Sequence, residues 1–335
     1  MISRVAEGGY WLQRHMERAE SMARILGVTS GGGLDGELPV QLRWAPLLVV
    51  AGEYPQFVQR YGVDAAARQD DVLDYLTWDT QNPVSIYSCV KWARENARII
   101  RETISRETWE SINATWLWMD APASRTAWRD DPAGFYRHMR DAGHQFRGAV
   151  VGTMPDTEPL WFMNLGMYME RANQTARILD VRHHALGPTR LDKLDNATDM
   201  VTWVQILLAC GAYESFFKRN RGTVRGYRVA RFLLFDHTLP RSVLYCLDKV
   251  DECLQHVQSL DPEPRALRSQ AVLGSVQNIL VDRSIEDIIE SGMHEQLTKV
   301  IDGIIELGNS LYVDFFAPSY EPPLPSAPAE LHSHS

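Results

Sequence analysis

The sequence predicts an all-α protein, built as an internally duplicated, pseudo-two-fold helical bundle. Three observations predict this fold class. Apolar residues recur at helical spacing along most of the 335 residues, no segment alternates apolar and polar residues as a half-buried strand does, and one helical segment occurs twice. Residues 16–28 and 169–181 are identical at nine of thirteen positions and lie 153 residues apart. Each half therefore carries one Glu-Arg pair, Glu17-Arg18 or Glu170-Arg171.

The duplication extends beyond this segment. Asp79, Pro83, Ser85 and Cys89 follow one another with the same steps as Asp236, Pro240, Ser242 and Cys246. We therefore expect a first helical repeat over residues 1–153 and a second over 154–316, packed on the first as one unit. The tail, residues 317–335, contains several prolines and few apolar residues, so the sequence predicts that it is disordered.

Helical periodicity places the elements in order. In the first helix, apolar residues fall on one face and recur in the second copy; they are Leu12, Met16, Ala19, Ala23 and Leu26, matched by Leu165, Met169, Ala172, Ala176 and Leu179. A second long helix is predicted from Ser85 to about Ile112, after the start signal Asn82-Pro83. Further helices are predicted near 40–61, 135–151, 198–220, 240–258, 268–281 and 293–316.

Composition narrows the classes of partner and compartment. The formal net charge is −9, which argues against broad binding to nucleic acid or to an anionic membrane. The chain has 29 Arg and 5 Lys, a bias that favours bidentate ion pairs but is equally expected from GC-rich codons. The sequence shows no signal peptide and no transmembrane run. Its four cysteines form no CxxC pair, so we expect reduced, buried thiols in a cytoplasmic protein.

The charges of the Glu-Arg pairs need partners on other helices. Arg14 and Arg18 lie four residues apart, at the edge of the apolar face. Glu17 points about 100° away from Arg18 around the helix, so the two side chains do not pair with each other. The same geometry applies to Glu170 and Arg171. Because a half-buried charge without a partner is costly, we expect each to bind a residue of a different helix.

The helix after Pro83 offers one set of partners. Arg94, Arg98 and Arg101 are spaced as a ridge along one face, and Glu95 and Glu102 form an acidic stripe beside it. The second half has no such ridge, and Met167 replaces Arg14 there. We therefore predict one anion-binding site, in which the ridge faces the first Glu-Arg pair. The predicted ligand-binding residues are Arg14, Arg18, Arg94, Asn96, Arg98, Arg101 and Glu102.

The alternative is a structural ion-pair network that clamps two helices of the bundle. In that interpretation Glu170, Arg171, Arg24 and Arg177 form structural ion pairs. Signals for other chemistry are weak: there is no HExxH, Glu-x-x-His or GxSxG motif, so no metal and no cofactor are predicted. Ser85 and Ser242 are interpreted as helix N-caps rather than nucleophiles.

The sequence resembles the bacterial alpha-E family, whose members are α-helical proteins named for a Glu-Arg motif. The resemblance rests on two motifs and covers about residues 1–318: Ser3-Arg-Val-Ala-Glu with Tyr10-Trp-Leu, Arg14 and Glu17-Arg18-Ala-Glu, then Ala93-Arg-Glu-Asn-Ala-Arg98 with Arg101-Glu102, Trp109-Glu110 and Asn113. The chain departs from the family at Gly8-Gly9. The resemblance implies an association with a circularly permuted ATP-grasp ligase and a transglutaminase-like protein, in systems that make or process an amide-linked product.

Three functional hypotheses follow. The first is an accessory or co-catalytic protein of an ATP-grasp-dependent peptide or amide ligation system, which binds the ligase or an anionic carboxylate or phosphate ligand through the Arg/Glu cluster. The second is a stand-alone amide-forming transferase or hydrolase, with Glu17 or Glu95 as general base. The third is a non-catalytic structural scaffold. The sequence leaves open whether the protein is an enzyme.

Overall fold

The computed structural model describes residues 3–30, 44–186, 197–220, 222, 224–260 and 265–317, and these residues contain helices and no strand. The prediction of an all-α protein is confirmed. The predicted tail lies, apart from residue 317, outside the described residues.

The helices follow one another along the chain with short connections. They are α1 (Ser3–Ser30), α2 (Ala45–Ala51), α3 (Tyr54–Tyr61), the 3-10 turn η2 (Val63–Ala67), α4 (Gln69–Thr77), α5 (Ile86–Ile99), the 3-10 turn η3 (Arg101–Thr103), α6 (Arg106–Asp120), α7 (Pro122–Asp130), α8 (Pro132–Thr153), α9 (Glu158–Leu186), α10 (Ala197–Ala209), α11 (Tyr213–Arg219), α12 (Gly226–Phe235), α13 (Val243–Ser259), α14 (Arg268–Gln277), α15 (Ile285–Glu290), α16 (Met293–Leu311) and the π turn η5 (Tyr312–Phe316).

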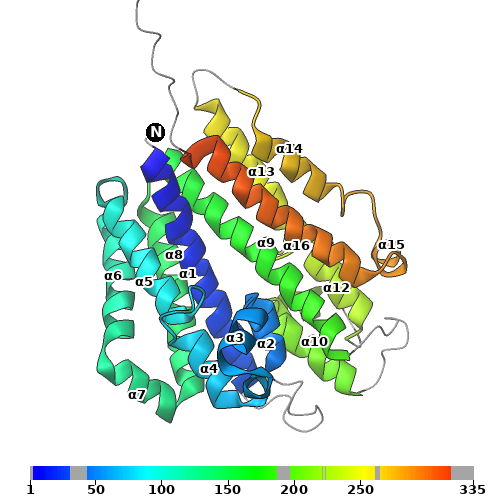
Figure 1. Cartoon of the computed structure of the whole chain (residues 1–335). Coiled ribbons are helices and arrows are strands. Elements are labelled where there is room, and N and C mark those ends of the chain that lie inside the picture. The colour runs from blue at the N-terminus through cyan, green and yellow to red at the C-terminus, as the bar shows by residue number, and fades with distance from the viewer. Residues whose placement is uncertain are drawn as a thin grey trace, which may run out of the picture.

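Two groups of four helices meet along α1 and α9, which lie side by side in the middle of the molecule (Figure 1). In the first group, α1 packs on α5 and α8, and α6 packs on both α5 and α8. In the second group, α9 packs on α13 and α16, and α14 packs on both α13 and α16. Two further helices cross between the groups: α2 packs on α9, and α10 packs on α1.

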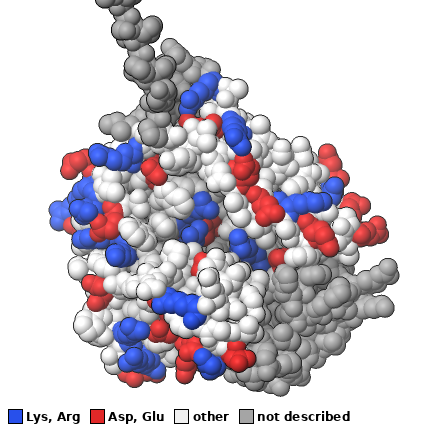
Figure 2. All heavy atoms as spheres, in the orientation of Figure 1, with Lys and Arg blue, Asp and Glu red and all other residues white. Residues whose placement is uncertain are grey.

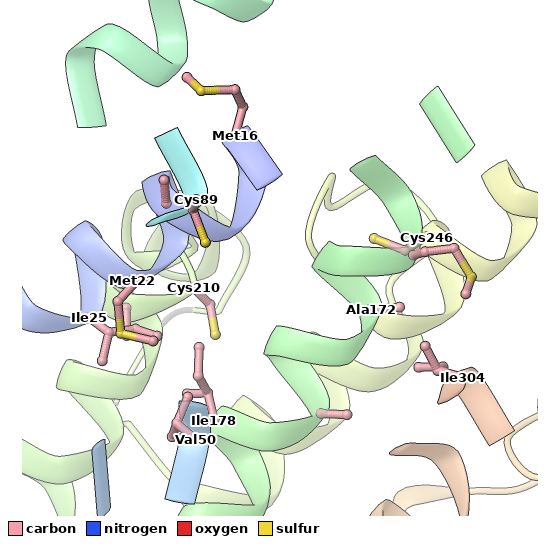
Figure 3. Packing of buried hydrophobic residues seen from close by; sticks show 14 of the residues in the cluster. Met16, Met22, Ile25, Val50, Cys89, Ala172, Ile178, Cys210, Cys246 and Ile304 are labelled. Carbon is pink, nitrogen blue, oxygen red and sulfur yellow. The ribbon is translucent and has the colours of Figure 1, made fainter. Parts of the chain in front are cut away.

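The apolar face predicted for the first helix is the core of the molecule. Leu12, Met16 and Leu26 of α1 are at most 2% exposed. The cysteine thiols lie in the same core: Figure 3 shows Cys89 and Cys246 among buried apolar side chains. All four cysteines are buried and unpaired. Burial raises the pKa of the thiols, to about 12 for Cys89, so the thiols are protonated and unreactive at neutral pH.

Glycines in the left-handed region divide two of the predicted helices. The segments predicted as single helices near 40–61 and 198–220 are each two helices, and these predictions are wrong at Gly52 (φ +76°) and Gly211 (φ +61°). Glycine reaches positive φ without the steric cost that other residues have, so it ends a helix there. Helical periodicity on both sides of the break hides this interruption in the sequence.

The helix predicted from Ser85 to about Ile112 also ends early. α5 stops at Ile99, and α6 begins after Ser105, whose Oγ accepts the backbone N–H of Thr108 at 3.1 Å. A capping hydroxyl satisfies a free amide of the new helix and makes a restart favourable. Ser85 caps α5 in the same way, and Ser242 caps α13, as predicted from the sequence.

Two glycines allow α1 to lie close to its neighbours. A Cβ on Gly166 of α9 would lie 2.1 Å from the backbone oxygen of Tyr10, and a Cβ on Gly8 would lie 2.5 Å from the side chain of Ile100, just after α5. At Gly166 the clashing atom is backbone and cannot rotate away, so glycine is required there; at Gly8 the side chain of Ile100 would have to shift. The close approach of α9 brings its charged residues within reach of those on α1.

The surface carries charges of both signs. On the face shown in Figure 2, basic and acidic side chains are interspersed and neither sign gathers in one region.

In the described part of the chain no single helix is both long and apolar enough to cross a membrane. The helices Met200–Ala209 and Tyr213–Arg219, bent by 118°, pass that test only as a pair.

Candidate functional site: a buried glutamate–arginine network

The two Glu-Arg pairs bind each other across the contact between α1 and α9. Glu17 and Arg18 lie on α1, and Glu170 and Arg171 lie on α9. Each glutamate contacts the arginine of the other helix: Arg18 binds Glu170, and Arg171 binds Glu17. Neither pair closes on itself, because neighbouring residues of a helix point about 100° apart.

Glu170 is held by two arginines of α1. Arg18 donates through Nε and Nη2 to the two carboxylate oxygens, each at 2.7 Å, and Arg14 donates through Nε at 3.0 Å. Gln174 adds a donor at 3.0 Å. A bidentate guanidinium is the strongest partner available to a carboxylate. Glu170 is fully buried, so these donors replace the water that its charge has lost.

Glu17 has arginines from three elements around it. Arg147 of α8 donates to Oε2 at 3.0 Å. Arg171 Nε and Arg241 Nη2 lie 3.1 and 2.7 Å from Oε1. The two contacts to Oε1 have the distances of ion pairs but not the alignment of hydrogen bonds. Glu17 therefore shares its single negative charge among three arginines, and its side chain has no accessible surface.

Glu20, one turn further along α1, is a third buried carboxylate in the network. It accepts from Arg147 at 2.9 Å and from Arg241 at 2.6 Å, and it also binds Arg24. His144 Nε2 lies 3.4 Å from the same carboxylate. Two guanidinium groups, from different elements, thus bridge Glu17 and Glu20.

Sequence reasoning missed three members of this network. Glu20 had a usable signal, because it lies three residues after Glu17 and so shares its side of the helix. Arg147 and Arg241 had none: they lie far away along the chain and reach the network only through the packing of α8 and of the turn before α13.

The described network contains more positive than negative charge. Its carboxylates are Glu17, Glu20 and Glu170, and its guanidinium groups are those of Arg14, Arg18, Arg24, Arg147, Arg171 and Arg241. Six arginines against three glutamates leave a formal excess of three positive charges. The carboxylates are fully buried, whereas Arg18 and Arg147 keep 16% and 27% of their side-chain surface exposed. The excess charge is therefore accessible at the edge of the network.

The arginines keep the three carboxyl groups ionised. Burial alone would raise the pKa of each. Against burial, Arg171 and Arg241 hold the pKa of Glu17 below its usual range, and Arg241 helps to hold that of Glu20 well below. The two α1 arginines lower the pKa of Glu170 in the same way. A general base at neutral pH needs a raised pKa, so these shifts run against that role.

A hollow of about 570 Å³ lies beside the network, between α1 and α5. Two of the predicted ligand-binding residues, Arg18 and Asn96, line it together with Trp11 and Trp92. Arg18 uses Nε and Nη2 for Glu170, so its Nη1 has no partner in the part of the chain that is described. The hollow thus combines a fixed cationic donor with aromatic walls.

His15 forms part of the same hollow. Its ring stacks on Trp11, with 5.4 Å between centroids, and its Nδ1 is buried with no hydrogen-bond partner among the described residues. Burial, together with the nearby Arg18, lowers the pKa of His15 to about 3. The ring is therefore neutral at physiological pH and adds no charge to the site.

The predicted ridge of three arginines is not continuous. Arg94 and Arg98 lie on α5, but that helix ends at Ile99, so Arg101 lies in the following 3-10 turn with the exposed Glu102. The spacing of the three residues would form one ridge only on an unbroken helix.

The ridge arginines also bind other groups than those expected. Arg94 and Arg98 both donate to Glu95, at 2.6 and 2.9 Å. Arg94 and Arg101 lie over the ring of Trp109 of α6. These side chains therefore point toward α6 and solvent, and not toward the first Glu-Arg pair as predicted. Arg14 and Arg18 bind Glu170 of α9.

The arginines predicted to form structural ion pairs have different partners. Arg171 binds Glu17 and Arg24 binds Glu20. Arg177 donates instead to the amide oxygen of Asn173, at 3.2 Å, so its partner in the described chain is neutral.

Within the described residues, no group of three His, Cys, Asp or Glu side chains is arranged to hold a metal ion.

Fold and site together define an all-helical protein whose centre is a buried glutamate–arginine network. A family model described as "a predicted alpha-helical domain with a conserved ER motif" matches residues 1–316. The chain belongs to this family, Alpha-E. The Glu-Arg pairs at positions 17–18 and 170–171 are the ones that the structure brings together.

The chain is also similar to two longer mycobacterial proteins. It is 23% identical over 316 residues to an uncharacterised protein of Mycobacterium bovis, and 22% identical over 316 residues to one of Mycobacterium tuberculosis. Each match covers 90% of this chain and 35% of the relative, so the chain spans about a third of the length of these relatives. No solved structure matches the chain.

Proposed function

We propose that this chain is a non-catalytic binding protein, in which the glutamate–arginine network clamps α1 to α9 and offers its positive edge to a carboxylate ligand. The observation that carries the proposal is the excess of guanidinium groups over carboxylates, in a network whose outer member Arg18 lines the hollow between α1 and α5. A ligand carboxylate placed at Arg18 would balance part of that excess.

The hollow suits a ligand that also has an apolar group. Trp11 and Trp92 line it, and Trp92 is 47% exposed. Asn96 donates its Nδ2 to the backbone oxygen of Trp92, so its Oδ1 is available as an acceptor. A peptide C-terminus with an apolar side chain has the three matching features: a carboxylate, an amide N–H and an apolar surface.

The partner class follows from the family. We propose that the chain acts in the cytoplasm beside a circularly permuted ATP-grasp ligase and a transglutaminase-like protein, holding the peptide that the ligase extends or releases. This part rests on the resemblance to the alpha-E family and on the carboxylate chemistry of the hollow, since amide ligation consumes a carboxylate.

Catalysis by Glu17 or Glu95 is the less favoured alternative. Glu17 is buried beneath three arginines, and its pKa is held below the usual range. Glu95 is bound by two arginines. Burial raises the pKa of Glu95, but the two arginines outweigh burial and lower it. A carboxylate stabilised in its ionised form is a weak base. Binding is therefore the role that these environments support.

We further infer that the two halves arose by duplication and are related by a pseudo-two-fold axis between α1 and α9. The packing supports this, because the two groups have the same pattern of contacts. α1 packs on α5 and α8, and α6 packs on both of them; α9 packs on α13 and α16, and α14 packs on both of them. Each half also uses its own glutamate to bind the arginine of the other half. In this arrangement the clamp is one motif that binds its own copy.

Matching turns support the same inference. Ser85 and Ser242 both cap a helix and donate their hydroxyl to the backbone oxygen of the aspartate six residues earlier. The cysteines at 89 and 246 each lie against the backbone oxygen of the proline six residues earlier.

The ligand proposal is tested with N-acetylated aromatic dipeptides whose C-terminus is either free or amidated. At a hundredfold excess over Kd, a real ligand raises the free energy of unfolding by about 2.7 kcal/mol. We expect the free acid to produce such a shift and the amide to produce none. Trp92→Ala should weaken the effect, whereas Leu117→Ala, which removes an exposed apolar side chain from α6, should not. A flat response to all peptides would overturn the ligand proposal and favour the scaffold.

The partner proposal is tested by co-elution with an ATP-grasp ligase encoded beside the gene for this chain. We expect a complex on size-exclusion chromatography and a change in ligase turnover. If no complex forms and turnover is unchanged, the chain does not act on the ligase, whatever the outcome with free peptides.

A further inference from the structure

A second hollow, of about 560 Å³, lies between the end of α11 and one face of α12, and no residue of the glutamate–arginine network lines it. Three arginines line it: Arg219 from α11, and Arg228 and Arg231 from α12. We propose that this hollow is a binding site for a small molecule that bears a phosphate group and a flat apolar portion.

The arginines of this hollow exceed its acidic groups. Asp236 is the one acidic residue among the described residues that line it. Its Oδ2 accepts from Arg219 at 2.7 Å, and its Oδ1 accepts from both the backbone and the hydroxyl of Thr238. Asp236 is therefore occupied by one arginine and by its own turn, and it neutralises neither of the other two arginines.

Those two guanidinium groups keep free donors. Arg228 donates Nε to the hydroxyl of Tyr227 at 3.0 Å, a neutral partner that leaves its charge uncompensated. Arg231 is exposed and has no ion pair or hydrogen bond with any described residue. Guanidinium groups with free N–H donors bind phosphate oxygens bidentately. The local excess of positive charge in an acidic protein favours a dianion over a single carboxylate.

Aromatic rings form the rest of the lining. Tyr227, Phe232 and Phe235 contribute to it. Arg219 lies over the ring of Phe232, and Arg228 over that of Tyr227, each with 5.8 Å to the centroid. These contacts fix the two guanidinium groups beside the rings. The volume falls in the usual range of about 300–1,000 Å³ for small-molecule sites.

The first half provides a comparison on a similar backbone. α4 begins 157 residues before α12, and the turn after each helix carries an aspartate that binds an arginine: Asp79 with Arg60, and Asp236 with Arg219. The positions of α4 that correspond to Tyr227, Arg228 and Arg231 are Asp70, Asp71 and Asp74.

The corresponding helix thus has the opposite charge. Asp71 binds Arg68 and Asp74 binds Arg125, so two of the three aspartates of α4 are paired. A helix in this position folds with aspartates where α12 has arginines. The arginines of α12 are therefore not required for the turn or the helix, and this supports their role in ligand binding.

The test uses the full chain and three probes: phenyl phosphate, inorganic phosphate and phenol. Binding is measured by titration calorimetry. We expect saturable binding of phenyl phosphate, weaker binding of inorganic phosphate and none of phenol. Arg231→Asp, which introduces the residue found in α4, should weaken phenyl phosphate binding at least tenfold without a change in Tm.

The control is Arg137→Asp on α8, which changes the net charge equally at an exposed position far along the chain. It should weaken binding less than twofold. Equal losses in the two variants would mean general charge attraction, and the absence of saturable binding to either phosphate probe would overturn the proposal. Trp92→Ala should leave phosphate binding unchanged, so the outcome here is separable from that of the peptide hollow.

Discussion

At the residue scale, the glutamate–arginine contacts fix the position of α1 along α9 as well as contributing to stability. Removing two ions from water costs several kcal/mol each, and a buried pair recovers this only when its geometry is good and its remaining hydrogen-bonding groups are satisfied. Arg18 and Glu170 meet that condition with two contacts of 2.7 Å. Because each charge has its partner on the opposite helix, a shift of α1 along α9 would leave both unpaired.

Glu170→Gln tests this network directly. The substitution leaves Arg14 and Arg18 buried without a carboxylate, and we expect the free energy of unfolding to fall by about 3–5 kcal/mol. Urea denaturation followed by circular dichroism measures it. Glu110→Gln is the control, since Glu110 pairs with Arg106 at the surface, with 56% and 78% of the two side chains exposed. That change should cost less than about 1 kcal/mol. Equal costs for the two variants would refute a structural role for the network.

Acid should destabilise the protein in two steps. His15 has a folded pKa of about 3, below its ordinary 6.5, so the unfolded chain binds a proton first and stability falls as pH drops below about 6.5. The buried glutamates, exemplified by Glu170, have depressed folded pKa values, so their contribution is full above the unfolded value of 4.5 and is lost below it.

The histidine step can be isolated by comparing urea midpoints at pH 5 and pH 7. We expect His15→Gln to lose less stability between these values than the unsubstituted chain, because the glutamates are still ionised there. His138→Gln changes an exposed histidine and should show the full loss. A full loss in His15→Gln as well would contradict the assignment of this step to His15.

At the element scale, single residues decide where helices end and how closely they pack. Gly52 and Gly211 divide segments whose apolar pattern looks continuous, and Ser105 restarts a helix after α5. Gly166 sets the separation of α1 and α9, since any side chain would meet the backbone oxygen of Tyr10. The geometry of the charged site thus depends on a residue with no side chain.

Gly166→Ala should therefore force α1 and α9 apart. We expect a loss of about 1–3 kcal/mol, the usual cost of overpacking, since the clashing atom is backbone and cannot rotate away. Gly148→Ala is the matched substitution: it lies within α8, with no atom within 4 Å of the added Cβ, and should gain about 0.5–1 kcal/mol. Thermal unfolding of the two variants measures both. Similar shifts in the same direction would contradict the close crossing.

At the scale of the whole molecule, the two four-helix groups share one interface. α1 and α9 each belong to a group and also contact each other, while α2 and α10 each pack on the central helix of the other group. The network adds Arg147 from α8 and Arg241 from the turn before α13. Elements of both halves therefore converge on the same buried charges.

A cut between the halves should leave them associated. A protease site inserted at the exposed Asp156, between α8 and α9, would separate the chain without removing any contact of the network. We expect the cut protein to elute as one species and to unfold in one transition. Separation of the two pieces without denaturant, or two distinct transitions, would refute a single cooperative unit. The inserted but uncut protein is the control.

Much of this protein is set by the sequence alone. The helical period predicts the all-α class, and it predicts Leu12, Met16 and Leu26 as core because every third or fourth residue of a helix shares a face. The same geometry indicates that Glu17 and Arg18 need partners elsewhere. Capping by Ser85 is also local, since the hydroxyl reaches only its own helix end.

The tertiary structure alone decided which charges meet. The sequence predicts partners for Glu17 on α5. In the structure its partners lie on α8, on α9 and in the turn before α13. That choice depends on how closely whole helices approach, which long-range packing sets and local propensity does not contain. The sequence contains the charge reversal between α4 and α12. Only the fold shows that the arginines of α12 line a hollow and that Asp71 and Asp74 of α4 are paired.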